Sequence, residues 1–239
     1  MALPYKLCFL GYGQLTVLAQ QVVQELSFDD CEIEVVDCLS DHATELVSQM
    51  TTKGFEVFIA GSANAAMISR HSQAHLQEVF VRDVDYLTAL KKAGSLGSRI
   101  AIAWHRFSRE PDLNLLVELS GIPAEILPYE ETAELFDLIR DSAYDVIVGA
   151  SQACSYAAEH HKKSVLVYAG KETVRRSFVK ARHLAVELRK EQRYRAISQA
   201  LIGNLPIGII VTNEEGRITS INQLARNHLN VSANFARGR

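Results

Sequence analysis

The sequence has few cysteines, no long apolar run and no large excess of either charge. Its cysteines, Cys8, Cys31, Cys38 and Cys154, form no CxxC pair, which favours reduced, packed thiols. No apolar run approaches the roughly 20 residues that a membrane helix needs, and the first residues lack a signal-peptide pattern, so we expect a cytoplasmic protein without membrane contact. A formal net charge of −3 gives no electrostatic case for direct nucleic-acid binding.

Motifs that carry catalysis or metal binding are also missing. The sequence contains neither the GxSxG nucleophile pattern nor the GxxxxGK[ST] phosphate loop. His71 and His75 stand four residues apart, but no carboxylate or cysteine ligand has suitable spacing. Cys154 lies one helical turn after Ser151, where a buried helix-face thiol is a simpler interpretation than a nucleophile. We therefore expect no cofactor, no metal and no enzymatic activity.

One stretch has part of a dinucleotide-binding fingerprint. Gly11 and Gly13 follow an apolar run, and Asp37 ends the next run. The third glycine position holds Thr16, whose branched side chain prevents a helix from packing closely on the strand. We therefore do not expect a nucleotide there.

Short apolar runs alternate with helical spacing along most of the chain. The runs span 6–11, 32–37, 56–61 and 78–83 in a first set, and 99–104, 124–129, 145–150 and 164–170 in a second. Near-continuous apolar strands separated by helices are typical of parallel sheets covered on both faces. A closed eight-stranded barrel usually needs about 250 residues. The sequence therefore predicts two Rossmann-like, flavodoxin-like α/β lobes with a cleft between them.

Composition shifts suggest the boundaries. Lobe 1 is expected at about residues 1–83 and lobe 2 at about 98–170, with a helix at 84–94 that ends in a Gly/Ser-rich join. The two-lobed domain is predicted to cover residues 1–190. The connector helix is predicted to span 172–201 and so to extend beyond that domain.

A different pattern begins after the connector helix. Residues 207–212 and 217–222 are predicted to form a β-hairpin around the turn 213–216, with a helix from about Gln223. A lone hairpin is marginally stable, so we expect 202–239 to be part of a larger domain. Its open edge favours self-association.

Ligands of parallel sheets bind beyond the carboxyl ends of the strands. The candidate ligand-binding residues at these ends are Gly11, Tyr12, Ser62, Ala63, Asn64 and Asp85, followed by Trp104, His105, Arg106, Tyr129, Gly149, Ser151, Gln152, Ala169, Gly170, Lys171, Glu172 and Thr173.

Three of these strand ends have similar sequences: AGSANA at 60–65, VGASQA at 148–153 and YAGKET at 168–173. Small residues let an anion approach the free N–H groups of a helix's first turn. Tight packing and helix capping use the same residue types and remain an alternative. His105, Arg106 and Lys171 are candidates for direct charge.

The stretches VDYLTALKKAG, SRIAIAW, YDVIVGAS and VYAGKETVRRSF resemble the propionate catabolism activator N-terminal domain. This is the sensory part of sigma-54-dependent transcription activators, and the resemblance covers about residues 5–190. The segment LPIGIIVTNEEGRITSINQLARNHL resembles the opening of a PAS domain. The resemblance implies a cytoplasmic ligand sensor rather than an enzyme. It also implies that contacts with DNA and sigma-54 polymerase occur only through ATPase and helix-turn-helix domains outside this chain.

The resemblance further implies a ligand like 2-methylcitrate, but the residues depart from the family pattern. The family often has Ser-Arg-Gly-Gly-Thr-Ala after the third strand, where this chain has Gly61-Ser62-Ala63-Asn64-Ala65-Ala66. One arginine is therefore lost. Asp83 is added before the helix at 84–94, where only Asp85 matches. We hypothesise a less acidic effector, or one different in kind.

Two other functions remain open from the sequence. One is a small α/β enzyme such as a racemase or a nucleotide-dependent reductase, which the lack of a paired nucleophile and base disfavours. The other is a dimerisation module without a ligand.

Overall fold

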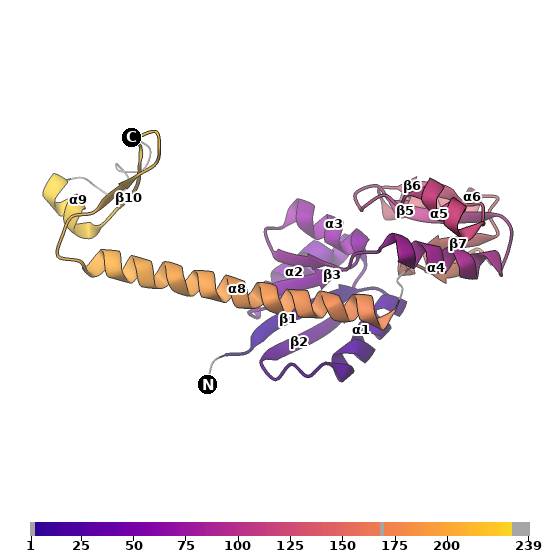
Figure 1. Cartoon of the computed structure of the whole chain (residues 1–239), viewed down its shortest axis with the longest axis horizontal. Coiled ribbons are helices and arrows are strands. Elements are labelled where there is room, and N and C mark those ends of the chain that lie inside the picture. The colour runs from indigo at the N-terminus through magenta and orange to yellow at the C-terminus, as the bar shows by residue number, and fades with distance from the viewer. Residues whose placement is uncertain (1–2, 168–169, 231–239) are drawn as a thin grey trace. The chain divides into compact units, whose positions relative to one another are not determined.

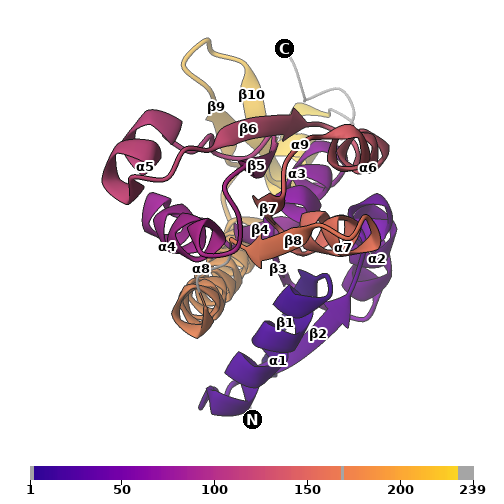
Figure 2. The same cartoon turned by 90° about the vertical axis from the view of Figure 1, so that its right-hand side faces the viewer.

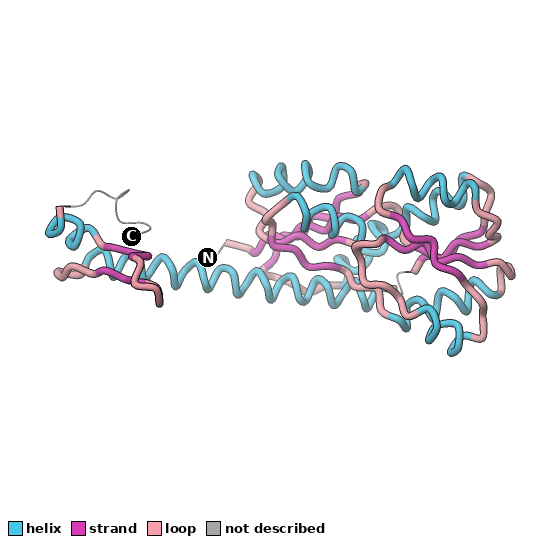
Figure 3. The backbone as a smooth tube through the Cα atoms, turned by 90° about the horizontal axis from the view of Figure 1, so that it is seen from above, coloured by secondary structure: helices cyan, strands magenta, loops and turns pink. Residues whose placement is uncertain are grey.

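The computed structural model describes residues 3–167 and 170–230. The chain forms two compact units, Met1–Ala185 and Val186–Arg239. The first unit contains two lobes built around parallel four-stranded sheets, which confirms the predicted α/β fold class (Figure 1). Figure 3 shows that helices flank the strands of each sheet.

Lobe 1 follows a regular alternation of strands and helices. Its elements are β1 (Tyr5–Gly11), α1 (Gln14–Glu25), β2 (Cys31–Asp37), η1 (Ser40–His42), α2 (Ala43–Thr52), β3 (Val57–Ala60), α3 (Ser62–His71) and β4 (His75–Glu78). The strand order is β2-β1-β3-β4, and all pairs are parallel. The central strands β1 and β3 are nearly continuous apolar runs because helices cover both faces.

Lobe 2 repeats this topology. It contains α4 (Asp83–Gly94), β5 (Ile100–His105), α5 (Leu113–Ser120), β6 (Glu125–Tyr129), α6 (Thr132–Asp141), β7 (Val146–Gly149), α7 (Ser151–Glu159) and β8 (Lys163–Leu166). The order is β6-β5-β7-β8, again all parallel. In both lobes the chain reverses its winding between the two central strands, which is where open α/β sheets bind ligands.

The fourth strand lies earlier than the sequence predicted. An apolar run suggested a strand at 78–83, whereas β4 spans His75–Glu78. This edge strand pairs with β3 alone and carries little apolar character. Val79 is fully buried and donates the next hydrogen bond to Ala60 O, after which the chain leaves the sheet.

Two helices pack on the lobe that they do not follow in sequence. Helix α4 follows β4 of lobe 1 but packs on β7, β8 and α5 of lobe 2 (Figure 2). Helix α8 (Lys171–Asn204) follows β8 of lobe 2, yet Phe178 stacks on Phe9 of β1 with ring centroids 5.4 Å apart. Arg182 also donates two hydrogen bonds to Asp30 of lobe 1. The chain therefore passes between the lobes twice, once between β4 and α4 and once between β8 and α8.

The second unit contains the hairpin predicted from the sequence. Strands β9 (Ile210–Thr212) and β10 (Ile218–Ile221) are antiparallel and precede α9 (Gln223–Leu229). Asn222 links the segments of this unit through four hydrogen bonds. Its Oδ1 accepts from Ile209 N and Ala225 N, and its Nδ2 donates to Ile202 O and Ile207 O. The PAS assignment and the domain boundaries remain predictions.

Within the described ranges, no helix is both long and apolar enough to cross a membrane.

Candidate functional site

The carboxyl ends of both sheets meet at a cavity of about 40 Å³ between the lobes of the first unit. By the usual criterion for water sites, this volume holds about three water-sized groups. Most of its walls are corners that follow β1, β3, β6 and β7, with one segment after β2. The lining residues are Leu10, Gly11, Tyr12, Leu15, Leu39, Ser40, Gly61, Ala63, Asn64, Tyr129, Ala150, Ser151 and Gln152. No charged side chain is among them.

Two helices begin at this cavity, and neither has a side chain that caps its N-terminus. The N-cap residues of α3 and α7 are Gly61 and Ala150, which have no side chain that can accept a hydrogen bond. The first intrahelical bonds are donated by Ala65 to Gly61 O and by Cys154 to Ala150 O. The amides of the preceding turn lie at the positive end of the helix dipole. An anionic group of a ligand would supply the missing caps.

Helix α1 differs from these two helices because a side chain of the protein accepts hydrogen bonds from residues at its N-terminus. Gly13 N donates to Asp37 Oδ1 over 2.8 Å, and Thr16 Oγ1 donates to the same oxygen over 2.5 Å. The carboxylate that a dinucleotide fingerprint would place on a ribose is thus committed to the helix. A Cβ on Gly11 would lie 2.9 Å from Thr16 Oγ1, so no larger residue fits at this corner.

Gly149, the small residue at the end of β7, is also needed for packing. A Cβ on Gly149 would lie 2.8 Å from Cβ of Ala153, within α7. Packing therefore accounts for Gly149, whereas it does not account for the missing cap at Ala150. Packing is thus the explanation at Gly149, and anion binding at Ala150 stays a prediction.

Buried amide side chains line the cavity. Asn64 and Gln152 are each 7% exposed. Asn64 Nδ2 donates to Leu10 O and Cys38 O, and two carbonyl partners identify that end as the amide nitrogen. Among the described residues, Asn64 Oδ1 accepts no hydrogen bond, and it is not among the fully enclosed unpaired atoms. This oxygen is therefore available to a ligand donor in the cavity.

Neutral side chains also join the lobes around the cavity. Leu15 N of lobe 1 donates to Ser151 Oγ of lobe 2 over 3.3 Å. Ser40 Oγ and Thr132 Oγ1 lie 3.3 Å apart across the cleft. Gln152 Nε2 then donates to Thr132 Oγ1 over 3.2 Å. Two of these contacts, Leu15 to Ser151 and Ser40 to Thr132, connect the lobes directly beside the cavity.

A wider cavity of about 410 Å³ adjoins the first and shares Ser40, Ala63, Tyr129 and Gln152 with it. Its other lining residues are Asp41, Met67, Arg70, His71, His105, Glu130, Glu131, Thr132 and Ala133. The guanidinium of Arg70 in lobe 1 lies 3.2 Å from the ring centroid of Phe107 in lobe 2, so this contact spans the two lobes. This space has the size of a small-metabolite site.

The three expected sources of positive charge are neutral, exposed or paired. His105 is buried, and desolvation lowers its pKa below the ordinary value, so the ring is neutral at pH 7. Arg106 lies 3.9 Å from Glu130 at an exposed position. Lys171 pairs with Glu25. Neither Arg106 nor Lys171 lines the two cavities.

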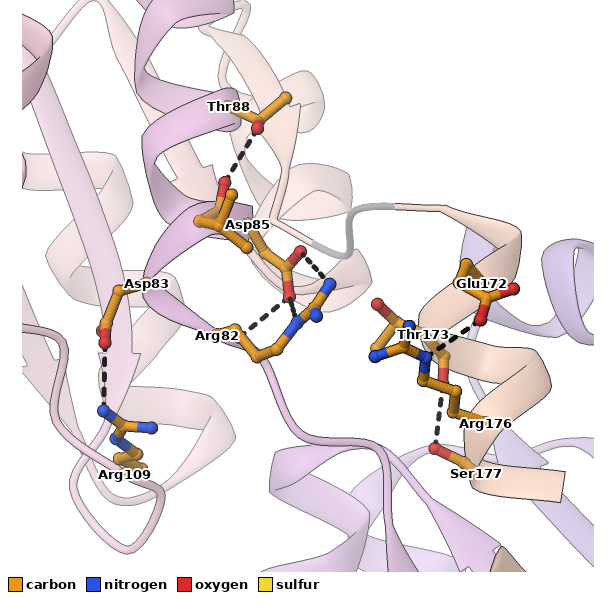
Figure 4. A network of polar contacts seen from close by, with 10 residues as sticks. Arg82, Asp83, Asp85, Thr88, Arg109, Glu172, Thr173, Arg176 and Ser177 are labelled. Carbon is orange, nitrogen blue, oxygen red and sulfur yellow. Dashed lines mark hydrogen bonds and ion pairs between the residues drawn. The ribbon is translucent and has the colours of Figure 1, made fainter. Parts of the chain in front are cut away.

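The third of the similar corners lies apart from these cavities. Gly170 lines a separate cavity of about 560 Å³, and Thr173 lines another of about 110 Å³. Glu172 pairs with Arg176 on the surface of α8 (Figure 4). Ala169 lies outside the described residues. Because α8 returns to lobe 1, its first turn does not face the cavity that α3 and α7 share.

The remaining predicted residues have local roles or lie beside the cavities. Asp85 caps α4 by accepting a hydrogen bond from Arg82 N over 2.9 Å, so its buried carboxylate is committed (Figure 4). Trp104 Nε1 donates to Arg109 O. Ser62 and Gly149 flank lining residues without lining either cavity themselves.

Sequence reasoning missed Ser40 and Thr132, which join the lobes. Ser40 follows β2, so the rule of carboxyl strand ends predicts its position. Thr132 begins α6 and could be mistaken for an ordinary helix-start residue.

Chemistry that needs a metal or a thiolate has little support in the described ranges. Residues 3–167 and 170–230 contain no group of three or more potential metal ligands. Burial raises the pKa of Cys154 to about 11, so this thiol is protonated at neutral pH.

Comparisons with known proteins support a regulatory assignment. The sequence profile of the propionate catabolism activator matches residues 27–191. The crystal structure of an NtrC family transcriptional regulator from Clostridium acetobutylicum superposes with a TM-score of 0.65 at 16% identity, covering 79% of this chain and 100% of that chain. An ABC domain from Streptococcus pneumonia in complex with L-Trp gives a TM-score of 0.46 at 10% identity, covering 78% and 85%, which is too loose to support a conclusion. No curated protein matches the chain.

Proposed function

The chain belongs to the propionate catabolism activator family, whose members are sensory domains of transcription regulators, and on that premise we propose that it senses a small ligand in the cleft between its lobes. The observation that carries the proposal is the pair of uncapped helix starts, α3 and α7, that face one cavity from opposite lobes. A ligand with an anionic group satisfies both helices only when the lobes are closed. Its binding therefore favours the closed form by its differential affinity.

The output of the sensor is proposed to pass to other parts of a regulator. Helix α8 begins where the second crossover returns to lobe 1 and continues into the second unit, so a movement of the lobes changes the position of its first turn. Contacts with DNA and with polymerase belong to other domains of such a regulator, and self-association through the second unit remains part of this proposal. A role without catalysis is consistent with the protonated thiol of Cys154.

A thermal-unfolding screen of the whole chain tests the proposal. The probes are small carboxylates and phosphorylated metabolites, and a true effector at a hundred times its dissociation constant raises the free energy of unfolding by about 2.7 kcal/mol. Ala63→Leu places a larger side chain in both cavities and is expected to abolish this effect. Ala66→Leu, on the same helix but outside both cavities, is the matched control. Absence of any stabilising ligand, or equal responses of the two variants, contradicts the proposal.

A further inference from the structure

We propose that the ligand is a small zwitterion, with one carboxylate and one ammonium group, rather than a di- or tricarboxylate. The inference rests on the proposed function, because it assigns the chemistry of the same cleft. It comes from how acceptors, donors and charges are distributed over the two adjoining cavities.

The narrow cavity accommodates one anionic group and no more. Its volume of about 40 Å³ corresponds to about three non-hydrogen atoms, which is the size of a carboxylate. Its anion-binding groups are the amides at the starts of α3 and α7, each with a partial charge of roughly half a unit. Since no cationic side chain lines this cavity, a second or third carboxylate of the ligand has to lie in the wider one.

The wider cavity is unfavourable for additional negative charge. Three carboxylates, Asp41, Glu130 and Glu131, line it together with Arg70, which lies over Phe107, and His71. Of the three, Glu130 pairs with Arg106 at an exposed position. Burial keeps the His105 ring neutral there at pH 7. A tricarboxylate would place two further negative charges in the cavity that these carboxylates line, and like charges repel.

Groups that favour an ammonium line both cavities, Asn64 the narrow one and Asp41 the wider one, and each is next in sequence to a residue that the cavities share. Asn64 Oδ1 is an acceptor without a donor among the described residues, in a side chain that is 93% buried. Asp41 takes part in no ion pair within residues 3–167 and 170–230, and its Oδ1 lies 3.4 Å from both Ser40 Oγ and Thr132 Oγ1. Its neighbour Ser40 lines both cavities. An ammonium next to a bound carboxylate donates to these two acceptors and neutralises the unpaired charge of Asp41.

The α-amino acids carry a carboxylate and an ammonium group on the same carbon atom. Their carboxylate fills the narrow cavity, the ammonium lies at the junction, and the side chain extends into the space of about 410 Å³. A hydroxyl in place of the ammonium keeps the shape of the ligand but removes its positive charge, so the corresponding α-hydroxy acid provides the decisive comparison.

Calorimetric titration of the whole chain tests the assignment. The probes are the twenty common L-amino acids, the 2-hydroxy analogue of each amino acid that binds, citrate and 2-methylcitrate. We expect at least one amino acid to bind, and its hydroxy analogue to bind at least about ten-fold more weakly, because a hydrogen bond to a charged group contributes about 1.5–3 kcal/mol. Binding of citrate or 2-methylcitrate without any amino acid overturns this inference but leaves the proposed sensor intact. Failure of all these probes and of the wider screen overturns both.

An isosteric substitution locates the ammonium. Asp41→Asn keeps the shape and the hydrogen-bond acceptor but removes the charge, and we expect it to weaken amino-acid binding several-fold while leaving the hydroxy analogue unaffected. Asp29→Asn, also exposed and in lobe 1 but outside both cavities, is the matched control. Equal affinities of the Asp41→Asn chain and the unmodified chain for the amino acid contradict the placement.

Discussion

At the scale of the residue, Asn64 has a role in the fold and a role in the proposed site. The side-chain amide of Asn64 donates hydrogen bonds to the backbone carbonyls of Leu10 and Cys38. Only its oxygen therefore remains for a group in the cavity. The side chain is fixed by these bonds, so its acceptor is preorganised. The same residue thus supports lobe 1 and contributes to the cavity.

Replacing Asn64 with leucine is expected to affect both roles to different extents. Two buried carbonyls lose their donor, which costs about 1–3 kcal/mol of unfolding free energy for each unsatisfied group. Ligand-induced stabilisation is expected to disappear although the chain still folds. Circular dichroism confirms the fold, and denaturant unfolding with and without ligand measures the two effects. A folded variant with an unchanged ligand response contradicts the role of Asn64.

The buried His105 gives stability a defined pH dependence. Desolvation lowers its folded-state pKa, with a further lowering by Arg70 and an opposing effect of the Glu130 backbone and charge. The unfolded chain takes up this proton near pH 6.5, whereas the folded chain resists it. The stability that the neutral ring contributes is therefore present above that pH and is lost as the pH falls toward the folded-state pKa.

His105→Gln is expected to reduce this acid-side loss of stability. Urea unfolding at pH 7.5 and at pH 5.5 gives the loss for each chain, and the variant should lose less than the unmodified protein. His75→Gln, at an exposed position on the edge strand β4, is the control and should leave the profile unchanged. A variant with the same acid-side loss as the unmodified chain would show that His105 is not the responsible group.

At the scale of elements, the two helix starts at the cleft lack the side-chain caps that would stabilise them. An N-cap side chain at Ala150 is expected to stabilise α7 by about 1 kcal/mol, because Ser and Asp are preferred at this position. In the proposed site, an anionic group of the ligand takes the place of this cap.

Ala150→Asp supplies α7 with a built-in carboxylate. We expect a higher melting temperature without ligand and no further rise with ligand, because the new side chain occupies the anion position. Ala150→Ser caps the helix without charge and should raise stability while weakening binding to a smaller extent. Melting curves of the three chains with and without ligand measure both effects. Unweakened binding in Ala150→Asp would exclude α7 as an anion site.

The exchange of helices between lobes explains much of what the sequence could not predict. The corners after β1, β3 and β7 were predictable because strand ends of parallel sheets share an edge. The corner at Gly170 was not, because no local pattern reveals that α8 packs on lobe 1. The edge strand β4 was misplaced because tertiary pairing with β3, rather than its own weakly apolar sequence, defines it.

The contact of α8 with lobe 1 includes a buried aromatic pair. Phe178 is fully buried and stacks on Phe9, whereas its neighbour Val179 is 51% exposed. Phe178→Ala is expected to lower the unfolding free energy by about 3–5 kcal/mol. Val179→Ala should change it by less than about 0.5 kcal/mol. Denaturant unfolding of the two variants measures the difference, and similar values would contradict the docking of α8.

At the scale of the whole molecule, the first unit contains everything that the proposed site requires. Both lobes, the cavities between them and the first half of α8 lie within Met1–Ala185. The second unit is held together by the hydrogen bonds of Asn222. All of its partners lie within that unit, and they are Ile202, Ile207, Ile209 and Ala225. Ligand binding and the folding of the second unit are therefore expected to be separable.

A chain shortened to residues 1–190 is expected to fold and to keep the full ligand-induced rise in melting temperature. It retains Phe178 and Arg182, and so preserves the contacts of α8 with β1 and with Asp30. A chain ending at Leu166 lacks α8, exposes the face of lobe 1 that Phe178 covers, and is expected to lose cooperative unfolding. Thermal unfolding of the two truncations, monitored by near-ultraviolet circular dichroism, distinguishes these outcomes. If the 1–190 chain folds but no longer responds to a ligand that stabilises the whole chain, the second unit takes part in sensing and the site cannot be confined to the two lobes.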